Sequence, residues 1–424
     1  MATSNNSAVL VVGSLDTKGA EIGFLRDRLR AAGLTPEVVD IGVLGPAMIA
    51  ADVSREEIAA AGGESIAQLV VAGDRGRAMA AMHKGLAAWV RGRREAGMPA
   101  GMLAIGGSAG TAVATAGMRE LPIGVPKLMV STMASGDVRP YVGTSDICMM
   151  YSVADFTGLN RLTTTILSNA ADAIAGMCGH KAALPSASGR TLLGATMFGV
   201  TTPCVNRVKE LVEQAGYELL VFHATGTGGQ AMERLVTDGF IKGVLDITTT
   251  ELADELVGGV LTAGPHRLEA AGNMGVPQVV SVGAVDMVNF GAPETVPAKF
   301  AGRRFYPHNA AVTLMRTTIE ENRQLGEILA RKLNQATGPV TLLLPLRGVS
   351  MIDAEGKAFH DAEADAALFD AIRRYIGHHI KLVELDLHIN DPEFAAAIAS
   401  EFFQQADTPA AQFAGTFATA GDRA

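Results

Sequence analysis

The stretch Ala8-Val9-Leu10-Val11-Val12-Gly13-Ser14-Leu15-Asp16-Thr17-Lys18-Gly19 decides the fold class of this chain. Its first five residues form a short apolar run of the kind that makes a buried parallel strand. The run breaks at Gly13, and a helix follows in which Ile22, Leu25 and Leu29 share one face. A buried strand, a glycine turn and an amphipathic helix in this order predict an α/β fold built on a parallel sheet.

The same alternation continues along the chain. In the first half, strands are expected at 35–41, 69–72, 102–105, 127–130 and 147–150, and a helix over 159–177 closes that half. In the second half, strands are expected at 191–197, 219–222, 243–247, 278–282, 340–344 and 381–385. We therefore expect an α/β fold of two Rossmann-like lobes, each a mostly parallel sheet flanked by helices.

The length of 424 residues also suits two domains. We expect residues 1–180 to form an N-terminal Rossmann-like lobe, whose glycine-rich loops are considered below for nucleotide binding. Residues 181–190 contain proline and serine without periodicity and predict a linker. Residues 191–405 predict the second α/β lobe, and residues 406–424 a poorly ordered tail.

Composition and charge exclude several functional classes. The net charge is −9 and the charged residues are interspersed, so a nucleic-acid ligand is not expected. The 3 cysteines are widely spaced and the first residues lack the pattern of a signal peptide, which favours a cytoplasmic protein. The uncharged stretch 96–118 contains Pro99 and a glycine-rich run, so no membrane partner is expected.

Two glycine-rich loops in the first half are candidates for binding phosphate. Gly13–Gly19 lies between a strand and a helix, where free N–H groups and the helix dipole favour an anion. Within it, Lys18 suits a phosphate, and Asp16 suits a magnesium ion or a ribose hydroxyl. Gly106–Thr111 offers three glycines and two hydroxyls after another strand. The alternatives are a plain helix start capped by Asp16 or Thr17, and close packing of a helix on the sheet.

A third loop after the strand at 127–130 adds two hydroxyl groups on the same edge of the sheet. The candidate ligand-binding residues of the first half are therefore Gly13, Ser14, Asp16, Thr17, Lys18, Gly19, Gly106, Gly107, Ser108, Gly110, Thr111, Ser131 and Thr132, with Asp16 as the candidate metal ligand.

Polar residues at strand ends of the second half are candidates for catalysis. They are His223, Asp246, His308 and Arg347, with His223 as an acid or base and Arg347 as a clamp for a carboxylate or phosphate. The loop His223–Gly229 also has the composition of an anion nest. Thr248 with Glu251, and Thr318 with Glu321, match the spacing of helix capping boxes.

Six motifs in order carry a resemblance that covers most of the chain, from about Val9 to Phe402. They are Val11–Glu21, Gly106–Thr111, His223–Gly229, Val285–Phe290, His308–Thr317 and Leu344–Ser350. The set resembles a largely uncharacterised bacterial family similar to the N-terminal ATP-binding domain of the tomato mosaic virus resistance protein. The resemblance implies a two-lobed α/β fold, ATP and Mg²⁺ as ligands, and a homodimer.

The function expected from these observations is nucleotide binding, in a regulatory protein or a partner of a separate barrel enzyme. One alternative is an enzyme of small-acid or sugar-acid metabolism with its active site in the cleft between the lobes, which would take a small acidic substrate. Another is a dinucleotide-dependent oxidoreductase, although the G-x-G-x-x-G pattern is missing after the first strand.

Overall fold

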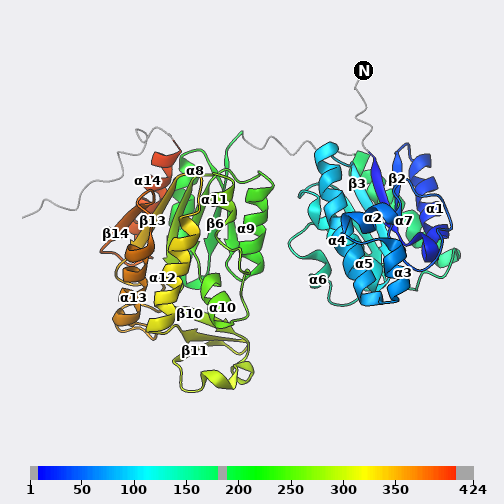
Figure 1. The fold of residues 1–424 in the computed structure, drawn as a ribbon. Helices are drawn as coiled ribbons and strands as arrows, with labels where there is room; N and C mark the ends of the chain where they lie inside the picture. The colour runs from blue at the N-terminus through cyan, green and yellow to red at the C-terminus, as the bar shows by residue number, and fades with distance from the viewer. Residues whose placement is uncertain (1–7, 180–188, 407–424) are drawn as a thin grey trace, which may run out of the picture. The chain divides into compact units, whose positions relative to one another are not determined.

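The computed structural model describes residues 8–179 and 189–406. The chain divides into two compact units, Met1–Ser186 (unit 1) and Ala187–Ala424 (unit 2), shown in Figure 1. Most of the linker predicted at 181–190, and all of the predicted tail except Ala406, lie outside the described residues. Each unit has its own sheet and its own hydrophobic core.

Unit 1 is built on a five-stranded sheet in which every strand pair is parallel. Its strands are β1 (Val9–Gly13), β2 (Pro36–Asp40), β3 (Gly101–Gly106), β4 (Lys127–Ser131) and β5 (Cys148–Tyr151). They lie in the order β2-β1-β3-β4-β5. Strands β1 to β4 are buried along almost their whole length, which explains their continuous apolar runs.

Helices cover both faces of this sheet because successive strand side chains point to opposite faces. Val9 and Val11 pack in the same core as α1 (Leu15–Ala31) and α7 (Arg161–Gly179). Leu10 and Val12 pack in the core on the other face. That second core is covered by α2 (Arg55–Ala61), α3 (Ile66–Ala72), α4 (Arg75–Ala96) and α5 (Ser108–Glu120), and a short α6 (Arg139–Val142) follows β4.

The predicted strand at 69–72 is wrong, because these residues lie in α3. Ser65 caps this helix by accepting a hydrogen bond from the N–H of Gln68, and Gly73 ends it in the left-handed conformation. A short apolar run does not by itself distinguish a strand from a helix. The side chains of Val70 and Val71 are exposed, whereas Leu69 faces the core.

Unit 2 has a six-stranded sheet, again with every strand pair parallel. Its strands are β6 (Leu192–Met197), β7 (Glu218–His223), β8 (Val244–Thr248), β9 (Gln278–Gly283), β13 (Val340–Pro345) and β14 (Lys381–Leu385). Their order is β14-β13-β9-β8-β6-β7. The expectation of parallel sheets flanked by helices is therefore confirmed for both units.

Helices cover both faces of this sheet as well. One core is shared with α8 (Thr202–Gln214) and α14 (Pro392–Gln405). A second core is shared with α10 (Glu251–Val257), α12 (Ile319–Leu333) and α13 (Ala362–Tyr375). A smaller core joins α9 (Thr227–Thr237) and α11 (Ala270–Asn273), and one turn of 3-10 helix, η1 (Gly199–Thr201), precedes α8.

A second, antiparallel sheet in unit 2 was not predicted. Its strands are β10 (Met287–Phe290), β11 (Phe305–Asn309) and β12 (Val312–Arg316), in the order β10-β12-β11. The short helical turns η2 (Pro293–Thr295) and η3 (Ala298–Phe300) lie within this insertion. In Figure 1 the insertion projects beyond one end of the six-stranded sheet.

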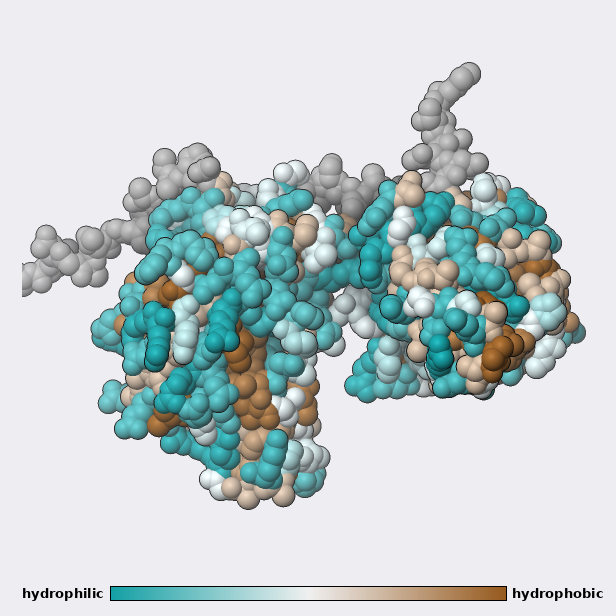
Figure 2. All heavy atoms as spheres, in the orientation of Figure 1, coloured by the Kyte–Doolittle hydropathy of each residue, from teal (hydrophilic) through white to brown (hydrophobic). Residues whose placement is uncertain are grey.

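Hydrophilic residues predominate on the face of each unit that Figure 2 shows. In the part of the chain that the structure describes, no helix combines the length and the apolar character needed to cross a bilayer.

The two sheets share one strand order. If the strands of each unit are counted from its own first strand, both sheets begin 2-1-3-4-5, and unit 2 adds a sixth strand at the edge. In this order the chain leaves the first strand toward one edge and later returns on its other side. The resulting switch point, between β1 and β3 in unit 1 and between β6 and β8 in unit 2, is where ligands bind in open α/β sheets.

Candidate functional site

The switch point of unit 1 carries a pocket. It has a volume of about 300 Å³, at the lower end of the range for small-molecule sites. The loop after β1 and the loop after β3 both line it. The two glycine loops singled out in the sequence are therefore brought together at one place, at the carboxyl ends of neighbouring parallel strands.

The N-terminus of α5 opens onto this pocket. The helix begins at Ser108, and among the described residues no side chain caps it. Ser108, Ala109 and Gly110 all line the pocket, so the first N–H groups of the helix and its positive dipole end lie at the pocket wall. A Cβ atom on Gly106 would lie 2.8 Å from the carbonyl carbon of Gly110, so this tight turn requires glycine. The turn suits an anion.

Two cationic side chains border the same space. Lys18 has non-helical backbone angles (φ −130°, ψ 23°) in the first turn of α1, which makes that turn irregular. Its Nζ lies 5.8 Å from the centre of the Phe156 ring, and no hydrogen-bond acceptor is assigned to it within the described ranges. Arg75, the first residue of α4, lines the pocket and is exposed. The sequence prediction included Lys18 and missed Arg75.

Asp16 fixes a third wall of the pocket. Its Oδ2 accepts hydrogen bonds from the N–H groups of Leu44 (2.7 Å) and Gly45 (3.2 Å). Its Oδ1 is buried and has no hydrogen-bond partner in the described chain. The alternative that Asp16 or Thr17 caps α1 is not observed, because Ser14 occupies the N-cap position.

The oxygen donors here fit a magnesium ion in part. Mg²⁺ is usually held by one or two carboxylates together with substrate phosphates and water. Asp16 offers its unpartnered Oδ1, and Asp155 also lines the pocket, although one of its oxygens accepts the N–H of Phe156. These two carboxylates are the residues that would hold such an ion beside a bound phosphate.

Apolar side chains form the remaining wall. Ile41, Val43, Leu44 and Met79 line the pocket, and Leu44 is 77% exposed. Asp40, at the end of β2, anchors this region by accepting hydrogen bonds from the N–H groups of Leu15 (3.0 Å) and Gly42 (2.8 Å). Burial raises the pKa of the Asp40 carboxyl group. The sequence prediction missed Asp40, although a carboxylate that directly follows the apolar residues Val38 and Val39 is a recognisable signal at a strand end.

Several predicted ligand-binding residues lie behind the pocket. Gly13 and Gly19 are buried against Ile22 and Met48, so they permit close packing of α1. The hydroxyl groups of Thr111 and Ser131 are hydrogen-bonded to each other (2.6 Å) and are buried. These residues, and half-buried Thr132, do not line the pocket. They shape the loops on which the lining residues stand.

In unit 2, the glycine loop after β7 is an anion nest occupied by the protein itself. The N–H groups of Gly226 (2.7 Å) and Gly229 (3.1 Å) donate to Oε1 of Glu251. The predicted capping box of Thr248 and Glu251 is therefore wrong. Helix α10 begins at Glu251 with Thr250 as its N-cap, so Glu251 does not stand at the third helical position. The capping box of Thr318 and Glu321 is confirmed.

A buried arginine completes this arrangement. Arg267 donates to Glu251 Oε2 (2.6 Å) and to both oxygens of Asp246 (2.5 and 2.7 Å), and it also contacts Glu233. Burial alone would lower the pKa of Arg267, but the three carboxylates raise it well above its usual value. Burial raises the pKa of Glu233 in spite of the arginine. Asp246, predicted to be catalytic, is thus buried in an ion network that joins β8 to the nest.

The four predicted catalytic residues do not form one site. His223 is exposed at the end of β7 beside the ring of Phe198, and His308 lies on the exposed strand β11. Arg347 is exposed, pairs with Asp386 through two hydrogen bonds (2.7 and 2.8 Å), and lines a different cavity. That cavity contains none of the other three residues. His308 belongs to the separate antiparallel sheet, and Asp246 is buried in the ion network, which accounts for part of this separation.

Comparison with known proteins assigns the chain to a family. Models of the N-terminal and C-terminal domains of the uncharacterised protein family UPF0261 match residues 7–183 and 190–406. A UPF0261 protein of Clostridium tetani is 53% identical over 93% of this chain and 98% of its own length. One from Mesorhizobium japonicum is 49% identical over 92% of this chain and 98% of its own length.

A tomato relative is longer. The tomato mosaic virus (ToMV) resistance protein Tm-1(GCR237) of Solanum lycopersicum is 40% identical over 95% of this chain, which covers 56% of that protein. Among solved structures, a UDP-N-acetylglucosamine 2-epimerase from Rickettsia bellii matches 65% of this chain and 79% of its own. The identity is 10% and the TM-score 0.23, a similarity too weak to support an inference. The family matches cover nearly the whole chain, and the protein belongs to the UPF0261 family.

Proposed function

We propose that unit 1 binds ATP together with Mg²⁺ in the pocket between β1 and β3. The observation that carries the proposal is that two separate glycine loops line one pocket at the switch point, beside an uncapped helix N-terminus. This combination of free N–H groups, a helix dipole and nearby cations suits a phosphate chain.

The polar and apolar walls of the pocket suggest which part of the nucleotide each wall would contact. The phosphates would meet the N-terminus of α5, with Lys18 and Arg75 neutralising their charge. Asp16 and Asp155 would share the magnesium ion with the phosphates. The base would lie over the apolar wall at Leu44, whose side chain is otherwise exposed.

Titration calorimetry with ATP and MgCl₂ tests the proposal. The wild-type protein is expected to bind, and Lys18→Met is expected to weaken binding by a factor of about 10 or more, the effect of losing a charge-assisted hydrogen bond. Lys84→Met is the matched control, because Lys84 is exposed on α4 and does not line the pocket. Absence of binding by the wild-type protein, or equal affinities for wild type and Lys18→Met, would refute the assignment.

The role of Asp16 is tested separately. Asp16→Asn keeps an oxygen that accepts the N–H groups of Leu44 and Gly45, so the loop is retained while the charge is lost. Affinity for ATP is expected to fall in the presence of Mg²⁺ and to change little in EDTA. An equal loss under both conditions would show that Asp16 supports the loop and does not hold the ion.

A further inference from the structure

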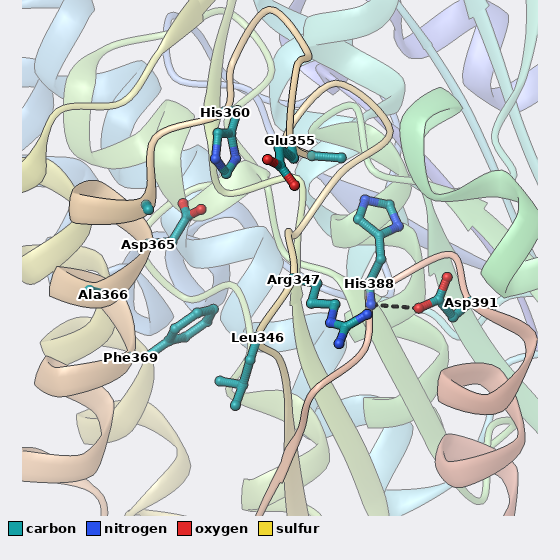
Figure 3. A pocket seen from close by; sticks show the side chains of 11 residues that line it. Leu346, Arg347, Glu355, His360, Asp365, Ala366, Phe369, His388 and Asp391 are labelled. Carbon is teal, nitrogen blue, oxygen red and sulfur yellow. Dashed lines mark hydrogen bonds between the residues drawn. The ribbon is translucent and has the colours of Figure 1, made fainter.

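A second cavity, in unit 2, has a volume of about 840 Å³ (Figure 3). It lies where β13 and β14 end, and its lining comes from the residues after these strands, from residues 354–360 and from the start of α13. Carboxyl ends of parallel strands are the usual place for a site in this fold, and the volume is that of a small-molecule site.

Some of the polar groups of this cavity are already committed to the fold. His388 accepts the N–H of Asn390 at Nδ1 (3.1 Å), and its Nε2 bonds to the carbonyl oxygen of Ser350 (2.9 Å). Both ring nitrogens are therefore used, with the proton on Nε2. Asp391 accepts the N–H of His388 (2.7 Å). Arg347 is neutralised by Asp386. His388 is therefore held by the fold at both ring nitrogens, and one oxygen of Asp391 is engaged as well.

Asp365 is different, because it joins the cavity to a buried cluster of carboxyl groups. Its side chain is 11% exposed, and its Oδ1 accepts a hydrogen bond from Nη2 of Arg316 (2.6 Å). The same arginine nitrogen lies 3.5 Å from Asp353, and Asp286 is buried close by, bonded to Ser350. Arg316 is thus the one cation among these groups that partly offsets the negative charge of three carboxyl groups.

The shortage of positive charge changes the ionisation of this cluster. Burial and the charge of Asp353 raise the pKa of Asp365, and Arg316 only partly opposes them. Burial and Asp353 likewise raise the pKa of Asp286, one oxygen of which has no hydrogen-bond partner among the residues described. A carboxyl group of this kind can both take and give a proton near neutral pH.

His360 provides a second group that can exchange protons. Figure 3 shows its ring and the carboxyl group of Asp365 turned toward each other at the cavity. In the described ranges no hydrogen bond is assigned to the ring of His360, which is exposed. A carboxylate base paired with an imidazole donor is an arrangement that enolises hydroxycarbonyl compounds.

The charge of the lining limits the ligand. With Arg347 paired, Glu355, Asp365 and Asp391 leave an excess of carboxyl groups. A phosphorylated or carboxylated molecule would have to compete with Asp386 for Arg347, whereas the hydroxyl groups of an uncharged sugar can donate to these carboxyl oxygens. We infer that this cavity is a second small-molecule site, at which Asp365 and His360 exchange protons with an uncharged ketose in its open-chain form.

The step needs no co-reactant. The Asp365 carboxylate takes a proton from the hydroxyl-bearing carbon next to the carbonyl group, and the electron pair of that C–H bond forms a carbon–carbon double bond. The carbonyl electron pair moves to its oxygen, which takes a proton from His360. Return of a proton from Asp365 to either carbon, and of the hydroxyl proton to His360, restores both residues.

Exchange of carbon-bound hydrogen in D₂O tests this inference without nucleotide, so the result is separate from that for unit 1. The probes are dihydroxyacetone, D-xylulose and D-fructose, followed by proton NMR. Wild-type protein is expected to exceed the protein-free rate with at least one probe. Asp365→Asn and His360→Gln are expected to lower the rate about 100-fold or more, the usual contribution of a general acid or base. Exposed His378→Gln is the matched control and should equal wild type.

Asparagine has the shape of a protonated Asp365 and keeps an oxygen for Arg316, so the first variant should fold, which its melting temperature checks. If it does not fold, His360→Gln decides, because that side chain is exposed. The expected rate for wild type falls as the pH is lowered and Asp365 takes up a proton. No exchange with any of the three ketoses, or a wild-type rate in His360→Gln, would overturn the inference.

Discussion

The two units have the same strand order, but their switch points differ. The switch point of unit 1 is open, and that of unit 2 is closed by side chains of the same unit. In unit 1, glycine, a bare helix N-terminus and two cationic side chains surround a pocket. In unit 2, β8 ends at buried Thr248, and the segment after it places Glu251 in the nest of the β7 loop, with Arg267 behind it. Thr248 is hydrogen-bonded across the switch point to Thr201, in the loop after β6 (2.7 Å). One unit offers its anion-binding groups to a ligand, and the other satisfies them internally.

The difference shows that a fold marks where a site can form and that side chains decide whether it does. Ser108 and Ala109 after β3 are too short to fill the space that Glu251 fills after β8. A nest of N–H groups attracts an anion in either case, so the glycine-rich composition of 223–229 predicted the nest correctly. The composition did not show that its anion comes from the same chain.

Removing the central cation of unit 2 should have the largest effect on this comparison. Arg267→Met leaves Asp246, Glu251 and Glu233 buried without their cation, and breaking a buried pair in this way costs about 3–5 kcal/mol. We expect unit 2 to unfold at a much lower urea concentration than in wild type, followed by circular dichroism. Arg347→Met is the control, since its pair with Asp386 is exposed to solvent and should contribute little to stability. A small loss in Arg267→Met would mean that the network is not needed to close the switch point.

The second prediction concerns another buried carboxyl group of unit 2. Burial raises the pKa of Asp254 from 3.8 to about 7. Well below pH 4 the carboxyl group is protonated in both the folded and the unfolded protein, so it does not lower stability. Between pH 4 and 7 the unfolded chain loses this proton and the folded chain keeps it. The free energy of unfolding therefore falls as the pH rises through this range. The Asp254→Asn variant has no carboxyl group to ionise here and does not lose stability in this way. Its free energy of unfolding relative to wild type should therefore increase between pH 4 and 7, by at most about 4 kcal/mol.

The neighbour of Asp254 can accommodate the change. Asn289 donates through Nδ2 to Asp254 (2.7 Å), and its buried Oδ1 has no partner among the residues described. In the Asp254→Asn variant, rotation of the Asn289 amide would present its Oδ1 to the NH₂ group that the substitution introduces. Urea unfolding at pH 4.5 and pH 7.5 measures the difference. A constant difference between variant and wild type would show that Asp254 is ionised in the folded protein.

The sequence predicted the framework well because local patterns determine it. The glycine turn after β1, the face of Ile22, Leu25 and Leu29, and the strand runs are all local signals, and those three side chains are buried in the structure. The failures have a physical cause too. The apolar run at 69–72 is too short to distinguish helix from strand. In the antiparallel insertion, β11 is exposed at every position and contains a proline, so it lacks the apolar run that marked the other strands.

The candidate sites were predictable only in part. Two glycine loops that follow strands meet because parallel strands end at one edge, so the lining by Lys18 and Ser108 followed from sequence. Arg267 gave no such signal, because it lies between helices and its three carboxylates come from other segments. Buried arginines are rare, and a partner distant in sequence is not visible in any local pattern.

A third prediction tests whether the open switch point depends on glycine. A Cβ atom on Gly106 would meet backbone atoms of Gly110 and Thr111 at 2.8–2.9 Å, so Gly106→Ala must displace the start of α5. The expected cost is about 1–3 kcal/mol of unfolding free energy, with loss of ATP binding in calorimetry. Gly92→Ala is the control, because nothing lies within 4 Å of its Cβ position on α4, and alanine should stabilise the helix by about 0.5–1 kcal/mol. If Gly106→Ala bound ATP with wild-type affinity, the glycine turn would not be needed for nucleotide binding.

The smallest expected effect lies at the closed switch point. The hydroxyl groups of Thr201 and Thr248 are fully buried and bonded to each other, and Thr196 donates to Asp246 beneath them. Thr201→Val leaves the Thr248 hydroxyl without its partner, and Thr248→Val leaves the Thr201 hydroxyl only its hydrogen bonds to the backbone of Phe198. The double variant removes both hydroxyl groups. A double-mutant cycle from urea unfolding should therefore give a coupling energy of about 1 kcal/mol, with the double variant less destabilised than the sum of the single ones. Additive losses would show that the hydroxyl groups are satisfied independently, and that Glu251 and Arg267 alone close the site that unit 1 keeps open.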